Sequence, residues 1–238
     1  MTQTANTNAL PCATILDRCL DGTARAGILL SFGYLGYGNL ISIRSQLPLD
    51  DVNKALMVLA AISNAMFLIL VAATALTRLR PIRKAKGIEP RLSALIGTFM
   101  CLGLAFLTKA NLSAFFSAFS SLLTILGGSL SFLVLRWLGR SFSLAPEARR
   151  LVTGGPYLFV RHPLYLCEGI TILGIVVQVL SPWAILIFLL FAAIQYRRMI
   201  NEEAVLRSAF PEYLEYAART PRIIPIDLVG RYTWRPAA

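Results

Sequence analysis

The residues best suited to chemistry lie in two short stretches of the C-terminal half. The first contains His162, the only histidine of the chain, directly after Arg161. Pro163 disfavours helical geometry for the residue before it, so we expect His162 to adopt an extended or turn conformation and to face a polar pocket. Tyr157 and Tyr165 flank this pair. An imidazole, a guanidinium and two phenols would suit an anionic ligand that also carries an aromatic ring.

The second stretch lies where the last apolar segment ends, and it combines acidic with basic residues. Arg198 and Glu202 are four positions apart, so on a continuous helix they share one face, one turn from each other. Glu203 and Arg207 have the same spacing, which equally suits a pair that only stabilises an exposed helix. We expect an acid and a base to stand together at the membrane boundary.

Other chemistries are disfavoured or left open by the same residues. One histidine cannot build a zinc site, the four cysteines show no CxxC spacing, and no GxSxG marks a nucleophilic serine. A single interfacial histidine can also be a structural hydrogen-bonding residue, and Arg161 can be an interfacial anchor. Glu168, a carboxylate in an apolar segment, is either functional or a side chain that reaches the interface.

The rest of the chain predicts the elements that must position these residues. Of the 238 residues 56% are hydrophobic and only 15% are charged, whereas soluble domains carry about 25% charge. We expect an all-α polytopic membrane protein with about six transmembrane helices, because the apolar residues gather in six long segments. The six segments are residues 26–43, 54–77, 92–108, 112–135, 164–180 and 183–196.

Two local patterns constrain how these helices pack. Only Ser181 and Pro182 separate the last two segments, and two residues can reverse the chain but cannot cross a membrane. The last two helices therefore form a tight antiparallel hairpin. In the fourth segment Gly127 and Gly128 predict a close approach of neighbouring helices.

The positions of Lys and Arg predict the orientation. The net charge is +11, and the basic residues concentrate in the connections 78–91 and 136–161 and after residue 197. With six spans all three regions fall on one side, which the positive-inside rule assigns to the cytoplasm together with both termini. We therefore expect the bacterial inner membrane as location and membrane lipids, not nucleic acid, as the partner of these charges. The sequence does not determine the oligomeric state.

Taken in order, the motifs resemble those of a known family. They look like the isoprenylcysteine carboxyl methyltransferase family and its bacterial and archaeal relatives, which include phospholipid N-methyltransferases. The resemblance covers roughly residues 127–227. It rests on the GPY and RHPLY motifs at 155–165, EEAVL at 202–206, FPEYLEY at 210–216 and PRIIP at 221–225. Pro211 stands where the family often has glycine, so the resemblance does not imply a prenylcysteine substrate.

The resemblance implies a cytoplasmic pocket for S-adenosylmethionine and a lipid-like or membrane-soluble methyl acceptor that enters from the bilayer. We expect an N-terminal cytoplasmic tail (1–25) and N-terminal transmembrane helices (26–126), followed by a methyltransferase-like core with a C-terminal cytoplasmic segment (127–238), the part that carries the resemblance. No GxGxxG is present, so the cofactor would not be held as in a soluble Rossmann enzyme. The cofactor-binding residues implied are Tyr157, Arg161, His162, Pro163, Tyr165 and Glu203, and the catalytic residues are Arg198 and Glu202.

The implied roles follow the chemistry of the cofactor. Arg161 and His162 would meet its carboxylate, the tyrosines its adenine or ribose, and Glu203 its ammonium. Arg198 would hold an anionic acceptor, or Glu202 would deprotonate an amine. Two alternatives stay open: an NADPH-dependent membrane sterol or steroid reductase, whose motifs are similar, and a small non-enzymatic transporter.

Overall fold

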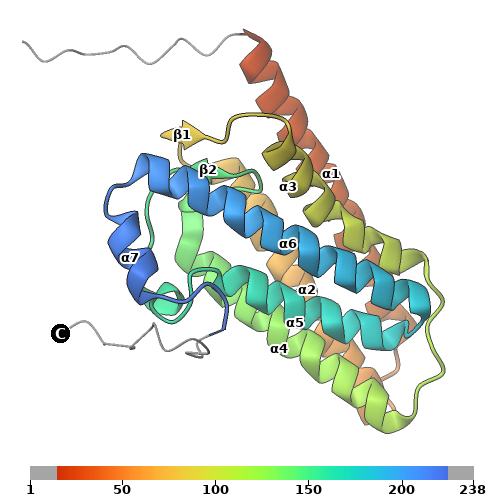
Figure 1. The fold of residues 1–238 in the computed structure, drawn as a ribbon. Coiled ribbons are helices and arrows are strands. Elements are labelled where there is room, and N and C mark those ends of the chain that lie inside the picture. The colour runs from red at the N-terminus through yellow and green to blue at the C-terminus, as the bar shows by residue number, and fades with distance from the viewer. Residues whose placement is uncertain (1–14, 225–238) are drawn as a thin grey trace, which may run out of the picture.

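Helices make up most of the described chain (Figure 1). The computed structural model of the protein describes the backbone of residues 15–224 and the side chains of residues 26–27 and 29–224. The helices are α1 (Ile15–Ser45), α2 (Val52–Thr77), α3 (Glu89–Phe99), α4 (Ala114–Leu138), α5 (Pro163–Gln178), α6 (Pro182–Ala209) and α7 (Tyr213–Arg219), with 3-10 turns η1 (Met100–Phe106), η2 (Gly139–Ser141) and η3 (Gly155–Leu158).

All six predicted apolar segments are helical, but they differ in their ability to span a membrane. By length and composition three qualify: Val52–Thr77, Ala114–Ser141 and Pro182–Ala209. The apolar helix α5 has 16 residues, and α3 gives way to a 3-10 turn at Met100. The helical fold class is therefore confirmed with three candidate spans, while the count of six stays a prediction. Most of the predicted tail, residues 1–14, lies outside the described residues, and residues 15–25 belong to α1.

The predicted C-terminal hairpin is present. Helix α5 ends at Gln178 and α6 begins at Pro182, and the two helices run side by side in Figure 1. The Ser181 hydroxyl accepts a hydrogen bond from the Ala184 backbone N–H at 3.2 Å, and Pro182 occupies the first turn, where no backbone donor is needed. This turn places the far end of α6 beside the start of α5.

Helix α4 packs between α5 and α2 through its two adjacent glycines. A Cβ on Gly127 would lie 2.8 Å from the Cys167 carbonyl oxygen of α5, and one on Gly128 would lie 2.7 Å from the Ser63 hydroxyl of α2. Gly174 of α5 likewise packs closely on α4, because a Cβ at this position would lie 2.9 Å from the Ser120 carbonyl oxygen. The sequence-based expectation of close packing at Gly127 and Gly128 is confirmed.

A short β-ribbon, which the sequence did not predict, joins two of the basic connections. Strands β1 (Arg83–Lys84) and β2 (Glu147–Ala148) pair in antiparallel register. Hydrogen bonds from Ile82 N–H to the Ala148 carbonyl (2.7 Å) and from Ala85 N–H to the Pro146 carbonyl (3.0 Å) extend the pairing. The ribbon ties the α2–α3 connection to the α4–α5 connection, which carries the RHPLY motif.

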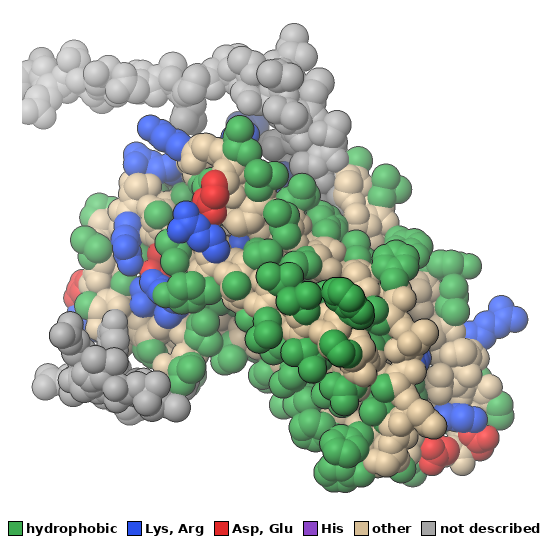
Figure 2. Space-filling model, turned by 45° about the vertical axis from the view of Figure 1, so that its right-hand side comes forward, with side chains coloured by type: hydrophobic (Ala, Val, Ile, Leu, Met, Phe, Trp, Pro, Cys, Tyr) green, Lys and Arg blue, Asp and Glu red, His purple; other side chains and the backbone are tan. Residues whose placement is uncertain are grey.

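The surface of the helices is strongly apolar. On the face in Figure 2 hydrophobic side chains cover the helical body, and most of the visible Lys and Arg side chains gather at its upper left. Large side chains such as Ile69 and Leu189 are 69% and 60% exposed. Exposed apolar surface of this extent on long helices is what a lipid environment stabilises.

Substituting Gly127 by alanine should lower the free energy of unfolding in detergent by about 1–3 kcal/mol, because the new methyl group overpacks the α4–α5 contact. Thermal unfolding of the purified protein measures the change. Gly36→Ala is the matched control, since a Cβ on Gly36 meets nothing within 4 Å. Equal stability of the two variants would contradict the packing described here.

Candidate functional site

Two stretches that are 60 residues apart in the sequence meet at the start of α5. The Arg161 backbone N–H donates to the Pro221 carbonyl at 2.8 Å, and the His162 N–H donates to the Arg222 carbonyl at 3.1 Å. His162 precedes the first residue of α5 and has φ −127° and ψ 58°, a non-helical geometry as predicted. The RHPLY motif and the chain after α7 therefore form one structural unit.

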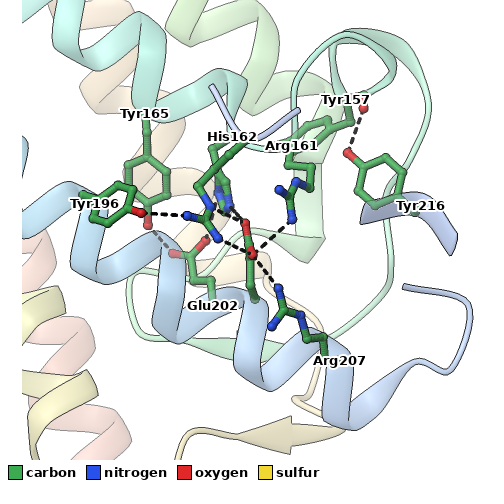
Figure 3. Close-up of polar contacts among 10 residues, drawn as sticks. Tyr157, Arg161, His162, Tyr165, Tyr196, Glu202, Arg207 and Tyr216 are labelled. Carbon is green, nitrogen blue, oxygen red and sulfur yellow. Dashed lines mark hydrogen bonds and ion pairs between the residues drawn. The ribbon is translucent and has the colours of Figure 1, made fainter. Parts of the chain in front are cut away.

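A single buried carboxylate holds this unit together. Glu203 of α6 is 1% exposed and lies among cationic groups from three parts of the chain. Figure 3 shows Arg161, His162 and Arg207 pointing toward this common centre. The oxygens of Glu203 accept from Arg222 Nε at 2.8 Å and Nη2 at 3.0 Å, and from His162 Nε2 at 3.2 Å; Nη1 of Arg161 and Nη2 of Arg207 each lie 3.1 Å away. Such charge-assisted bonds offset the cost of removing the carboxylate from water.

His162 lies between two neighbouring carboxylates of α6. Its Nε2 faces Glu203, and its Nδ1 is 3.9 Å from Oε2 of Glu202. Because an ionised carboxylate can only accept, Nε2 carries the hydrogen in the neutral ring. The Tyr165 hydroxyl donates to Glu202, and the Tyr165 ring centroid is 5.6 Å from that of His162. The histidine thus connects the buried Glu203 to the less buried Glu202.

Arg198 lies one turn before Glu202 on α6, as predicted, and several groups hold it in place. Its Nη1 donates to the Gln195 side-chain oxygen at 2.7 Å and its Nη2 donates to the Leu144 carbonyl at 3.2 Å. The guanidinium carbon is 5.1 Å from the centroid of the Tyr165 ring. Gln195 also donates to Glu168 at 3.0 Å. Tyr165 therefore contacts both residues, Arg198 through its ring and Glu202 through its hydroxyl.

These residues line a cavity of about 280 Å³ that extends from the polar groups into the apolar space between the helices. Of the predicted site residues six line it: Tyr157, Arg161, His162, Tyr165, Arg198 and Glu202. Pro163 instead begins α5, and Glu203 lies behind the cavity wall. Glu168, whose role the sequence left open, also lines the cavity. Both halves of the chain form the apolar part, for example Phe32, Phe67 and Leu68 of the N-terminal half and Phe142, Ile172 and Phe191 of the C-terminal half.

Several site residues were missed by the sequence analysis. Gln195 could have been noticed as an amide near the end of an apolar segment. Arg149 lies in a polar stretch where a further arginine gives no signal, and Arg222, although it belongs to the PRIIP motif, was given no role; only the tertiary structure brings both to the site. Arg149 pairs with Glu147 of β2 and lines the cavity.

The ionisation of the groups around the cavity mouth follows from burial and from ion pairing. Burial raises the pKa of the phenols of Tyr157 and Tyr213, so both remain neutral at physiological pH. Burial likewise raises the pKa of Tyr216, whose hydroxyl donates to the Tyr157 carbonyl at 2.7 Å. The hydrogen bond to Glu203 raises the pKa of Arg222, which keeps its charge. Among the described residues no three His, Cys, Asp or Glu side chains group as a metal site.

The fold and the site together define a helical protein of the membrane-embedded class, with a cavity that is polar at one end and apolar between the helices. Residues 115–213, from α4 to the first residue of α7, match the model of the family described as phospholipid methyltransferase. The resemblance inferred from the motifs is thereby confirmed. The match and the three apolar helices indicate an integral membrane protein related to methyltransferases.

Two metal-resistance proteins are similar to this chain over shorter stretches. The cobalt-zinc-cadmium resistance protein CzcN of Cupriavidus metallidurans is 44% identical over 87 residues, which are 35% of this chain and 40% of that protein. The nickel-cobalt-cadmium resistance protein NccN of Alcaligenes xylosoxydans xylosoxydans is 39% identical over 80 residues, 33% of this chain and 38% of that protein. The matched stretch spans about two fifths of either relative.

Replacing Glu203 by glutamine should lower the free energy of unfolding by about 3–5 kcal/mol, because the buried Arg161 and the partly buried Arg222 would then lose their anion. Thermal unfolding and the rate of tryptic cleavage after Arg222 measure the loss. The control is Glu215→Gln, whose pair with Arg219 is exposed and should contribute little. A variant as stable and as resistant as that control would show that Glu203 does not organise the site.

Proposed function

We propose that this protein is an integral membrane methyltransferase that transfers a methyl group from S-adenosylmethionine to a lipid-like or membrane-soluble acceptor. One observation carries the proposal: a single cavity joins a ring of arginine, histidine and tyrosine side chains to an apolar space between membrane-type helices. A charged cofactor and an apolar acceptor need these two environments next to each other. The family match supports methyl transfer as the reaction.

The polar end of the cavity fits the cofactor's charged and aromatic groups. Arg161 would hold the carboxylate, because its Nε is buried and has no hydrogen-bond partner among the described residues, so one N–H remains for a ligand. Tyr157 lines the same part of the cavity and would contact the adenine or ribose. His162 and Tyr165 complete this wall, and Pro163 places both at the start of α5.

Glu203 was predicted to bind the cofactor's ammonium, and this role stays a proposal with a specific requirement. The carboxylate already contacts three arginines and His162, so a ligand ammonium would have to displace one of them. Glu202 is 25% exposed in its side chain and lines the cavity, and among the described residues its one hydrogen-bond donor is Tyr165. It therefore offers a second carboxylate for the same ammonium.

The chain's own residues would act mainly by positioning. When bound, the cofactor supplies an electrophilic methyl group. Arg198, held by Gln195, Leu144 and Tyr165, would orient an anionic acceptor, and its buried Nε has no partner among the described residues. For an amine acceptor Glu202 would instead accept the proton. Exclusion of water and alignment of donor with acceptor would supply much of the acceleration.

We also propose that the cavity mouth faces the cytoplasm of a bacterial inner membrane. The basic connection 78–91 lies at the polar end of the cavity. Its strand β1 pairs with β2, which directly precedes the cavity-lining Arg149. Clusters of Lys and Arg favour the cytoplasmic side.

This orientation can be measured with single cysteines in a chain whose native cysteines are replaced by serine. A membrane-impermeant maleimide should label Lys86→Cys only after the cells are permeabilised. Leu49→Cys, in the connection between α1 and α2, is the matched control and should be labelled in intact cells. The reverse labelling pattern would overturn the proposed orientation.

Binding of radiolabelled S-adenosylmethionine to the purified protein tests the proposed function. The wild type should bind, and His162→Ala should lose binding because the cavity wall is broken. Arg198→Ala and Glu202→Ala should keep affinity closer to the wild type and lower methyl incorporation into an extract of membrane lipids, by about 10²-fold if alignment is lost.

A well-folded wild type without cofactor binding would remove the proposal. Titration with NADPH in parallel identifies the reductase alternative by a change in cofactor fluorescence. Solute flux in proteoliposomes without any cofactor would instead support a transporter.

A further inference from the structure

Helix α3 lies outside the part of the chain that matches the methyltransferase family, yet it packs directly on α6 beside the site. Four residues of α3 and of the turn that follows it recur at every fourth position and therefore lie on one face. They are Glu89, Ser93, Gly97 and Cys101. These four residues form the α3 stripe, which lies along α6 and extends to the cavity.

The first two residues of the α3 stripe set its position along α6. Oε1 of Glu89 accepts a hydrogen bond from Arg197 Nε at 2.9 Å, and both carboxylate oxygens of Glu89 accept from Asn201 Nδ2 at 3.2 Å. The amide of Asn201 also donates to the Ser93 hydroxyl at 3.1 Å. The hydrogen bond from Arg197 lowers the pKa of Glu89, which keeps it ionised at neutral pH. These contacts define the register between the two helices.

One turn further along the stripe the backbone of α3 touches the predicted catalytic arginine. A Cβ on Gly97 would lie 2.7 Å from Arg198 Cδ and 3.3 Å from its Nη1, and 3.0 Å from Ile194 Cγ2. The stem of Arg198 thus occupies the space that a side chain at position 97 would need. Gly97 and Arg198 both line the cavity.

The arginine cannot yield freely to such a side chain. Its guanidinium is held by the Gln195 side chain, the Leu144 carbonyl and the face of Tyr165. Arg198 is 5% exposed, so displacing the guanidinium costs these buried hydrogen bonds. The close approach of Gly97 therefore constrains the stem of Arg198, and these bonds constrain its guanidinium.

We propose that Gly97 is a positioning residue for Arg198, so that α3 of the N-terminal half is part of the catalytic unit. Its consequence for catalysis rests on the proposed methyl transfer, whereas the steric coupling between Gly97 and Arg198 does not. The absence of a side chain at position 97 sets where the guanidinium lies in the cavity. It thereby determines where an anionic acceptor group is held.

A double-mutant cycle tests the steric coupling without any activity measurement. Gly97→Ala should lower the Tm of the full-length protein in detergent by roughly 2–10 °C, as overpacking does. In an Arg198→Ala background the same substitution should lower the Tm by clearly less, because the δ carbon that it meets is gone and only the 3.0 Å approach to Ile194 remains. Gly103→Ala is the matched control, since its Cβ would make an ordinary 3.4 Å contact with Ile187.

The outcomes separate the alternatives. An equal loss of Tm in both backgrounds, or no loss in either, would overturn the coupling. Gly97→Ala that folds only in the Arg198→Ala background would support it, and failure to fold in both would overturn it. If Arg198→Ala itself does not fold, Arg198→Ser replaces it, since it also removes the δ carbon.

The kinetic arm uses radiolabelled S-adenosylmethionine and an extract of membrane lipids. Gly97→Ala should bind the cofactor with wild-type affinity and incorporate methyl groups about 10- to 100-fold more slowly, because Arg198 is displaced while the cofactor wall is intact. Gly103→Ala should match the wild type in both. Unchanged turnover in Gly97→Ala would overturn the positioning role. A wild type that binds no cofactor would sink the proposed function, and the Tm cycle would still decide the coupling.

Discussion

The site depends on the burial of one carboxylate. Glu203 collects cationic groups from the start of α5, from its own helix and from the chain after α7, and each of these groups loses its counter-charge if the carboxylate is removed. A buried ion cluster of this kind is expensive to form unless all its members are paired, so it assembles as a unit. The backbone bonds from Arg161 and His162 to residues 221 and 222 run beside it and give the same two stretches a second attachment.

Around this unit the two halves of the chain contribute different surfaces to one cavity. The C-terminal half provides the arginines, His162, the tyrosines and Glu202 together with part of the apolar wall, and α1, α2 and α3 provide the rest of that wall. The family match covers only residues 115–213, so α1, α2 and α3 lie outside the matched part although they line the same cavity. The close contact of Gly97 with Arg198 is one point at which the N-terminal half reaches the predicted catalytic group.

The names of the two similar proteins point to a biological context but not to a reaction. Their names concern resistance to cobalt, zinc, cadmium and nickel, and the matched stretch spans about two fifths of each. The proposed methyl transfer rests on the family match and on the cavity, not on these names.

The sequence by itself determined the local features: apolar segments that became helices, the two-residue hairpin at Ser181 and Pro182, the close packing at Gly127 and Gly128, and the non-helical His162 before Pro163. Each of these follows from neighbouring residues, because helix propensity, proline geometry and spacing are short-range. Tertiary structure alone decided that Glu203 is buried among three arginines, that Gln195 holds Arg198, that β1 pairs with β2, and that α3 reaches the site. These contacts join residues up to 112 positions apart, as between Glu89 and Asn201, and a pairing over such distances depends on how helices pack, which no local pattern encodes.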